Sequence, residues 1–298
     1  MTKRRRKRQE RLATLAGQTR PAADVWHNFV KHPVSMAALV VLIIMIIVAI
    51  VSGFVFNYET QVTAINTSQI LQWPSAEHWF GTDKFGRDVF IRVLYGARYS
   101  LFFGIVTTAI SMVLGILIGA TCAYFGGLYD VVVMRVMDSL VCIPSILLML
   151  TLVAVLGKGM RGIIIALVVT SVPGFARIIR SIVLNVVHQE YVEAARASGT
   201  GSAAIIVRHI LPNCFGPILV DVLMSVSSCI MAASSLSFLG MGIQAPAPEW
   251  GAMLNEAMEQ MRAYPYLGIF PGLAIVLTTL CFNLLGDGLT DALDPKNR

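Results

Sequence analysis

The side chains that could take part in chemistry gather in one polar stretch, EYVEAARASGTGSAAIIVRHILPN at residues 190–213, which lies between two strongly apolar regions. The stretch holds two glutamates, two arginines, one histidine and two glycines. Such side chains suit docking in a groove of another protein, and a solvated surface loop is the simpler alternative. A solvated loop has no need of the small-residue run at 194–199, so docking is favoured.

The pattern within this stretch predicts two short helices joined by a fixed turn. Residues 188–198 are rich in Glu, Ala and Arg, which are good helix formers, and Gly199 suits a left-handed residue at the helix end. Gly201 with Ser202 suits the start of a second helix. Pro212 is predicted to end that helix, because proline cannot continue the hydrogen-bond ladder. The second helix would carry a narrow apolar stripe of Ala203, Ile206, Val207 and Ile210.

A second polar segment, GTDKFGRD at residues 81–88, contains Asp83, Arg87 and Asp88. Charges in a loop close to lipid usually pair with one another or cap a helix. Contact with a binding protein or a substrate is the alternative. Tryptophans such as Trp250 are expected near the membrane–water interface, where aromatic rings are enriched.

Signatures of enzymes and metal sites are missing from the sequence. Gly157-Lys158 in VLGKGM is not followed by the Ser or Thr of a phosphate-binding loop, and no HExxH motif occurs. The cysteines form no CxxC pair, which argues against zinc or a disulfide framework. They are Cys122, Cys142, Cys214, Cys229 and Cys281. We therefore expect no catalytic residue, no metal site and no bound cofactor, and any ATPase would be another chain.

Composition places the chain in a membrane. Of its 298 residues, 56% are hydrophobic and 13% are charged, whereas soluble domains are about one quarter charged. The net charge of +6 could suggest nucleic acid, but nine of the 23 Lys and Arg residues lie in the first 31 positions. A basic run beside an apolar span is typical of a segment retained in the cytoplasm, so we expect lipid and no nucleic acid as a partner.

Long segments without charged residues predict six membrane spans, since a helix needs about 20 apolar residues to cross the hydrocarbon core. The fourth is the least regular, because it contains Pro173, Arg177 and Arg180, whose charges either reach the interface or face a protein interior. The predicted spans are 35–56, 100–125, 136–156, a fourth starting near 162, one within 222–248 and one within 263–286.

Six spans put both termini on the same side, which the basic N-terminus marks as cytoplasmic. Residues 126–134 and 187–215 are then cytoplasmic, and 58–98, 157–161 and 241–265 are external. The predicted organisation is a basic N-terminus with an interfacial helix at 1–34, a first span at 35–57, an external loop at 58–98, a core domain at 99–287 containing the cytoplasmic loop 188–213, and a tail at 288–298.

Gly115 and Gly119, at GxxxG spacing, and Gly104 are predicted to let helices pack closely.

The stretch at 190–213 resembles the EAA loop of ABC importer permeases, whose pattern is EAA-x3-G-x9-I-x-L-P. Six positions match this pattern: Glu193, Ala194, Ala195, Gly199, Leu211 and Pro212. His209 takes the place of the isoleucine, with Ile210 beside it. In that family the segment is a coupling helix that sits in a cleft of the cytoplasmic ATPase subunit.

Three more blocks extend the resemblance to the C-type permease subunit of bacterial dipeptide and oligopeptide importers. They are GTDKFGRDVFIRVLYGARYSL, SLSFLGMGIQAPAPEWGAML and FNLLGDGLTDALDP. The resemblance implies an all-α membrane protein with the six-helix, MetI-like fold of type I ABC importers, in the bacterial cytoplasmic (inner) membrane. It also implies import of di- or oligopeptides by alternating access.

The partners implied by the resemblance are a homologous second permease, two ATPase subunits that bind ATP and Mg, an external binding protein and a peptide. The implied ATPase-coupling residues are Glu193, Ala194, Ala195, Arg196, Gly199, Arg208, Leu211 and Pro212. The external residues that could meet the binding protein are Asp83, Arg87, Asp88, Glu249 and Trp250. Nickel or a glutathione-like molecule is an alternative substrate in the same branch, and a stand-alone secondary carrier is an alternative of another class.

Overall fold

The structure is a computed structural model that describes residues 22–293, and helices form most of this range. The predicted basic cluster in the first residues and the last part of the predicted tail lie outside the described residues. The main helices are α2 (Ala22–Val30), α3 (Pro33–Val55), α4 (Val89–Phe125), α5 (Gly127–Val141), α6 (Ser145–Leu156), α7 (Met160–Leu184), α8 (Glu190–Ala197), α9 (Ser202–Ala204), α10 (Leu211–Phe238), α11 (Trp250–Ala257) and α12 (Tyr266–Leu293).

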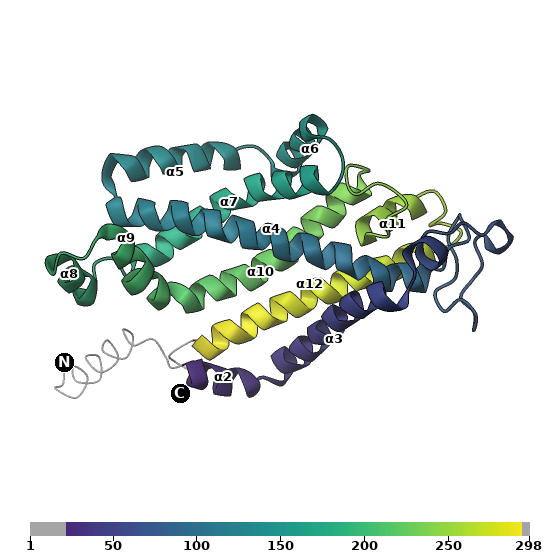
Figure 1. Cartoon of the computed structure of the whole chain (residues 1–298), viewed down its shortest axis with the longest axis horizontal. Coiled ribbons are helices and arrows are strands. Elements are labelled where there is room, and N and C mark those ends of the chain that lie inside the picture. Colours follow the sequence, from purple (N-terminus) through teal and green to yellow (C-terminus); the bar gives the residue numbers. More distant parts are fainter. Residues whose placement is uncertain (1–21, 294–298) are drawn as a thin grey trace.

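Within the described residues there are also three short elements: the π-helical turns η1 (Tyr58–Val62) and η3 (Ile205–Ile210) and the 3-10 turn η2 (Thr67–Gln69). Figure 1 shows the long helices running side by side along the molecule. Helices α8 and α9 lie at one end of this bundle, towards which α2 and the end of α12 also point. Helix α11 and the segment between α3 and α4 lie at the opposite end.

The described helices confirm the predicted membrane spans, but the third span is broken and the bounds of others differ from the prediction. Five helices are long and apolar enough to cross a membrane: α3, α4, α7, α12 and the continuous helix at 202–238. The third predicted span, 136–156, is not one helix but the pair α5 and α6, bent by 87°. Pro144 precedes α6, and a proline restricts the residue before it and donates no hydrogen bond, which accounts for the break.

Two spans begin earlier than the sequence predicts. Helix α4 starts at Val89 because the Asp88 carboxylate accepts a hydrogen bond from the Ile91 amide at 3.1 Å, so the predicted loop 58–98 ends at residue 88. The prediction that Pro212 ends a helix is wrong, since the helix runs on into α10. The Leu211 amide bonds to the Ile206 carbonyl in the preceding π-helical turn. This wider turn gives room for a residue that lacks an amide hydrogen.

Small residues allow the close packing between α4 and α7, as the glycine pattern predicts. A Cβ atom on Gly115 would lie 2.4 Å from the Phe175 Cβ, and one on Gly119 would lie 2.4 Å from the Ala176 carbonyl oxygen. A Cβ on Gly104 would lie 2.4 Å from the Ile230 side chain in α10. The two helices can therefore approach only because these positions lack side chains.

Replacing Gly119 with alanine is expected to lower the stability of the protein by about 1–3 kcal/mol, the usual cost of overpacking. Gly174→Ala is the matched control, because Gly174 lies in α7 with no neighbouring atom within 4 Å of a built Cβ. There, alanine should be neutral or stabilising by up to about 1 kcal/mol, since it favours helix more than glycine does. Thermal unfolding of the two purified variants measures both changes in stability. Equal unfolding midpoints for Gly119→Ala and Gly174→Ala would contradict the packing argument.

Candidate functional site

The predicted docking loop is a helix–turn–helix whose turn is fixed by backbone hydrogen bonds. Helix α8 ends at Ala197, and Gly199 adopts the left-handed φ of 81°. The Thr200 amide donates to the Ala195 carbonyl at 3.1 Å, and the Gly199 amide donates to the Arg196 carbonyl at 3.1 Å. These two bonds form the Schellman motif, which terminates a helix and sets the direction of the chain that follows.

An apolar cluster fastens the loop to the bundle. Val192 and Ala195 of α8 pack with Ile205, Ile206 and Ile210. The same cluster includes residues from α4, α7 and α10, namely Ala120, Ala123, Ile179, Val183, Cys214 and Ile218. A displacement of α8 must therefore move at least one of these three long helices, because a packed interior transmits strain.

The predicted apolar stripe of the second helix is only half correct. Ile206 and Ile210 are buried, but Ala203 is exposed and Val207 is 61% exposed. Ile205 takes their place in the cluster. The π-helical turn has a wider period than an α-helix, so it rotates the sequence relative to the 3.6-residue pattern used for the prediction.

Most of the predicted coupling residues lie on the outside of this loop. The exposed members are Glu193, Ala194, Arg196, Gly199, Arg208 and Pro212, and Leu211 is partly buried. Ala195 differs from them, because its side chain faces the apolar cluster. Its place in the motif is therefore explained by packing, since a larger side chain would push α8 away from the bundle. The Arg196 guanidinium lies over the Tyr124 ring at 5.1 Å from the ring centre.

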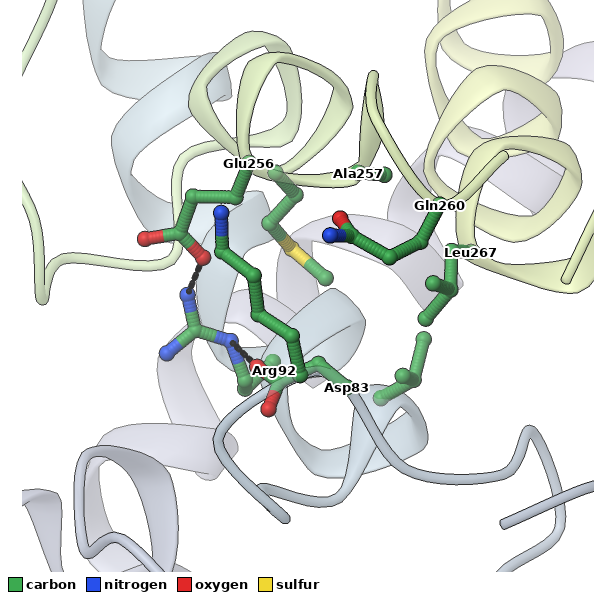
Figure 2. A pocket seen from close by; sticks show the side chains of 9 residues that line it. Asp83, Arg92, Glu256, Ala257, Gln260 and Leu267 are labelled. Atoms are coloured by element: carbon green, nitrogen blue, oxygen red, sulfur yellow. Dashed lines mark hydrogen bonds and ion pairs between the residues drawn. The ribbon is translucent and has the colours of Figure 1, made fainter. Parts of the chain in front are cut away.

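At the other end of the bundle, the predicted polar segment joins a network of ion pairs in which Arg92 lies between Asp83 and Glu256 (Figure 2). The Arg87 guanidinium bonds to Asp83 at 2.6 Å and to Glu256 at 2.5 Å. Arg92, which is 1% exposed, lies 3.1 Å from Glu256 and 3.6 Å from Asp83. Asp88 caps α4 and also lies 2.7 Å from His78. Of the two alternatives for this segment, the structure favours pairing and capping.

Glu249 and Trp250 are buried as well. The Glu249 carboxylate accepts hydrogen bonds from the amides of Gly251 at 3.0 Å and Ala252 at 2.8 Å, which caps α11. Burial raises the pKa of Glu249, and these hydrogen bonds oppose the increase. The Trp250 indole donates to the Val93 carbonyl at 2.9 Å. The Trp250 side chain therefore packs inside the protein, and its place near the membrane–water interface stays a prediction.

The burial of these external residues changes the interpretation of their role. Arg87, Glu249 and Trp250 offer almost no surface to a binding protein, so they hold the α11 end of the bundle together. A cavity of about 20 Å³ beside Arg92, Glu256 and Gln260 has room for about one water molecule. It is too small to be a peptide site.

Arg92 and Glu256, which were not predicted as site residues, complete this network. Arg92 falls in the region predicted as a loop, and Glu256 is 164 positions away from it. A charged residue within an otherwise apolar helix is a general signal of a functional or paired group. That signal is present at Arg92 once α4 is known to start at Val89.

Comparison with known proteins now decides the family. Residues 111–298 match the family described as binding-protein-dependent transport system inner membrane component. Residues 20–74 match the N-terminal TM domain of oligopeptide transport permease C. The chain belongs to this permease family. It is therefore a multi-pass protein of the inner membrane and a component of an ABC importer, a class that works with ATPase and substrate-binding partners.

Curated relatives and solved structures agree with this assignment. The permease is 44% identical over 276 residues to the glutathione transport system permease protein GsiD of Escherichia coli O6:K15:H31 (strain 536 / UPEC), covering 93% of this chain and 91% of the relative. It is 41% identical over the same length to GsiD of Pectobacterium atrosepticum. A structure of the inward-facing MetNI methionine ABC transporter matches with a TM-score of 0.56 at 17% identity, over 68% of this chain and 96% of that one. This likeness confirms the MetI-like fold.

The permease also has two ion pairs between α5 and α7. Arg180 makes two bonds of 2.5 Å to the carboxylate of Asp130. Arg177 bonds to Asp138 at 2.8 Å. The arginines that made the fourth span irregular in the sequence are thus paired with acids of the neighbouring helix.

Proposed function

We propose that this permease forms one half of the membrane path of an ATP-driven peptide importer, with a homologous second permease as the other half. Two ATPase subunits bind the α8 end, which is the cytoplasmic end, and the external binding protein delivers substrate at the α11 end. ATP and Mg bind to the ATPases and not to this chain. The path opens alternately to the two sides.

The observation that carries this proposal is the build of the α8 loop. Its outer face is exposed and polar at Glu193 and Arg196, while Val192 and Ala195 are held in the apolar cluster. A surface helix anchored in this way can accept a movement from a partner and pass it to the bundle. The Schellman turn at Gly199 keeps the direction of that movement fixed.

The proposed substrate class is small peptides, including peptides of the glutathione type. The match to the N-terminal domain of oligopeptide permease C supports peptides in general. The names of the GsiD relatives support glutathione in particular. The cavity of about 20 Å³ in the buried network is too small for a peptide, which agrees with selection of the substrate by the binding protein.

Reconstitution of the whole complex in liposomes tests this proposal. We expect ATP-dependent uptake of labelled glutathione or dipeptide, and ATP hydrolysis that rises when the loaded binding protein is added. A complex assembled without this chain is the control and should show neither. Uptake by this chain alone, driven by a proton gradient, would contradict the proposal and favour a secondary carrier.

A further inference from the structure

The outward faces of the long helices differ in polarity. Several helices expose almost purely aliphatic faces, as expected of side chains in contact with lipid. They include Val40, Ile43, Ile47 and Ile50 of α3, Ile105, Ile110, Val113 and Leu117 of α4, and Leu273, Val276, Leu277 and Leu280 of α12.

Helices α7 and α10 are different. Exposed or partly exposed polar and small residues recur along one side of each, interrupted by Met224 and Met231 on α10 and by Ile178 on α7. They are Gly174, Arg177 and Ser181 on α7, and Asp221, Ser225, Ser228 and Ser235 on α10. Their spacings of three, four and seven residues keep each set on one side of its helix. This side is poorly suited to lipid.

The ion pair between Arg177 and Asp138 is the strongest feature of this region. The two side chains are 55% and 49% exposed. Arg177 lies seven residues before the end of α7 at Leu184, which is about 10 Å inside the helix end at 1.5 Å per residue. Charged groups within an apolar span reach the interface or face a protein interior or a water-filled cavity, so the open side of this pair faces water or a polar partner and not acyl chains.

The neighbouring ion pair, Arg180–Asp130, shows that an ion pair can connect α5 and α7 with its carboxylate largely shielded from solvent. Arg180 and Asp130 make a two-bond contact, and Asp130 is 13% exposed. That pair already holds the two helices together near the α8 end. The Arg177–Asp138 pair makes a single bond and is left open, so it can exchange its partners at little structural cost, because exposed ion pairs contribute only weakly to stability.

We propose that Arg177 and Asp138 form a binding site for the charged ends of a peptide on its way through the membrane, an inference that rests on the proposed transport function. A peptide carries a carboxylate and an ammonium group. The carboxylate replaces Asp138 on the planar Arg177 guanidinium, which suits two-bond recognition. The ammonium group pairs with Asp138. The substrate class is therefore a molecule with both free ends.

The chain supplies its own reporter for this site. All five cysteines lie within residues 22–293, and Cys142 alone among them is exposed. Cys142 directly follows α5, four positions after Asp138. Residues four apart lie on the same side of a helix. A molecule bound between Arg177 and Asp138 should therefore hinder a reagent that approaches Cys142.

The experiment uses inside-out vesicles that contain the whole complex without the binding protein, so that added molecules reach the ATPase side directly. Cys142 is reacted with a sulfonated maleimide that does not cross membranes, and its modification is followed by mass spectrometry of this chain. We expect labelling, and at least threefold slower labelling when dialanine is added at saturating concentration. Dialanine with an acetylated N-terminus and dialanine with an amidated C-terminus should each slow the labelling of Cys142 less than free dialanine does.

Matched variants separate binding from structure. Arg177→Gln should abolish the protection by dialanine, whereas Arg180→Gln, the same change one turn away, should retain it. A Leu277→Cys variant on the aliphatic face should resist the sulfonated reagent and react with a permeant maleimide. Arg177→Gln should also slow peptide uptake at least tenfold.

Three results would overturn the inference. Cys142 that reacts only with the permeant maleimide would place this face in lipid, and Cys142 that reacts with neither reagent would place it in a protein interface. Equal protection by free and capped peptides would remove the role of the charged ends. If one of these results is obtained while uptake in liposomes is normal, the proposed binding site is wrong and the proposed transport function is still supported. Absence of ATP-dependent uptake by the native complex would instead refute the proposed function.

Discussion

Replacing Glu193 with arginine is expected to reduce ATP-driven uptake at least tenfold, which corresponds to about 1.4 kcal/mol of lost coupling. Glu193 is exposed on α8, next to the buried anchor Val192. A reversed charge at a docking surface brings two like charges together in place of an opposite-charge pair. In a close contact, the repulsion between like charges costs several kcal/mol. Because the side chain does not pack within the chain, insertion and folding of the variant should be unchanged.

Glu190→Arg is the matched control for this variant. Glu190 and Glu193 both lie in the first turn of α8, so reversal at either position has the same unfavourable effect on the helix dipole. The measurements are ATP hydrolysis, uptake in liposomes and co-purification of the ATPase with each variant. If Glu193→Arg retains normal uptake and normal ATPase binding, the coupling role of this residue is wrong. Equal losses in both variants would show that the helix itself is affected.

Replacing Arg92 with methionine is expected to destabilise the protein by about 3–5 kcal/mol, the usual cost of removing one partner of a buried ion pair. Arg92 donates to Glu256 at 3.1 Å and to the carbonyls of Val62 at 3.2 Å and Pro246 at 3.1 Å. Methionine fills similar space but satisfies none of these oxygens. The midpoint of thermal unfolding of the purified complex measures the effect.

Arg98→Met is the control on the same helix. Arg98 is exposed, and its guanidinium lies over the Tyr95 ring at 5.3 Å from the ring centre, an arrangement worth about 0.5–1 kcal/mol. The double variant Arg92→Met with Glu256→Gln should be less stable than Arg92→Met alone, because Glu256 also pairs with buried Arg87 at 2.5 Å and its loss removes an acid partner from that arginine. If Arg92→Met were as stable as Arg98→Met, the network would not hold the α11 end of the bundle together.

Local chemistry allowed several features to be predicted from the sequence. The spans at α3, α7 and α12 follow from long apolar segments. Gly199 ends α8 in a left-handed conformation because a residue with a side chain is strained there. Gly115 and Gly119 pack against α7 because their spacing puts both on one helix side. In each case the cause lies within a few turns of one helix.

Other features depend on residues far apart in the chain. The sequence pattern favoured Val207 over Ile205 as a buried residue, and the π-helical turn before Pro212 reversed that choice. Glu256 meets Arg92 only because α11 folds back against the start of α4. Hydropathy measures how apolar a segment is but not which partner its charged residues meet.

The sequence by itself determined the membrane class, the number of apolar segments and the position of the α8 loop, because these follow from composition and short-range periodicity. The tertiary structure decided that Ala195 packs inward while Glu193 stays exposed, and that Arg177 and Asp138 meet on the open side of α7. The physical reason is that burial and pairing are set by which helices lie side by side, and that arrangement is fixed by packing over the whole bundle.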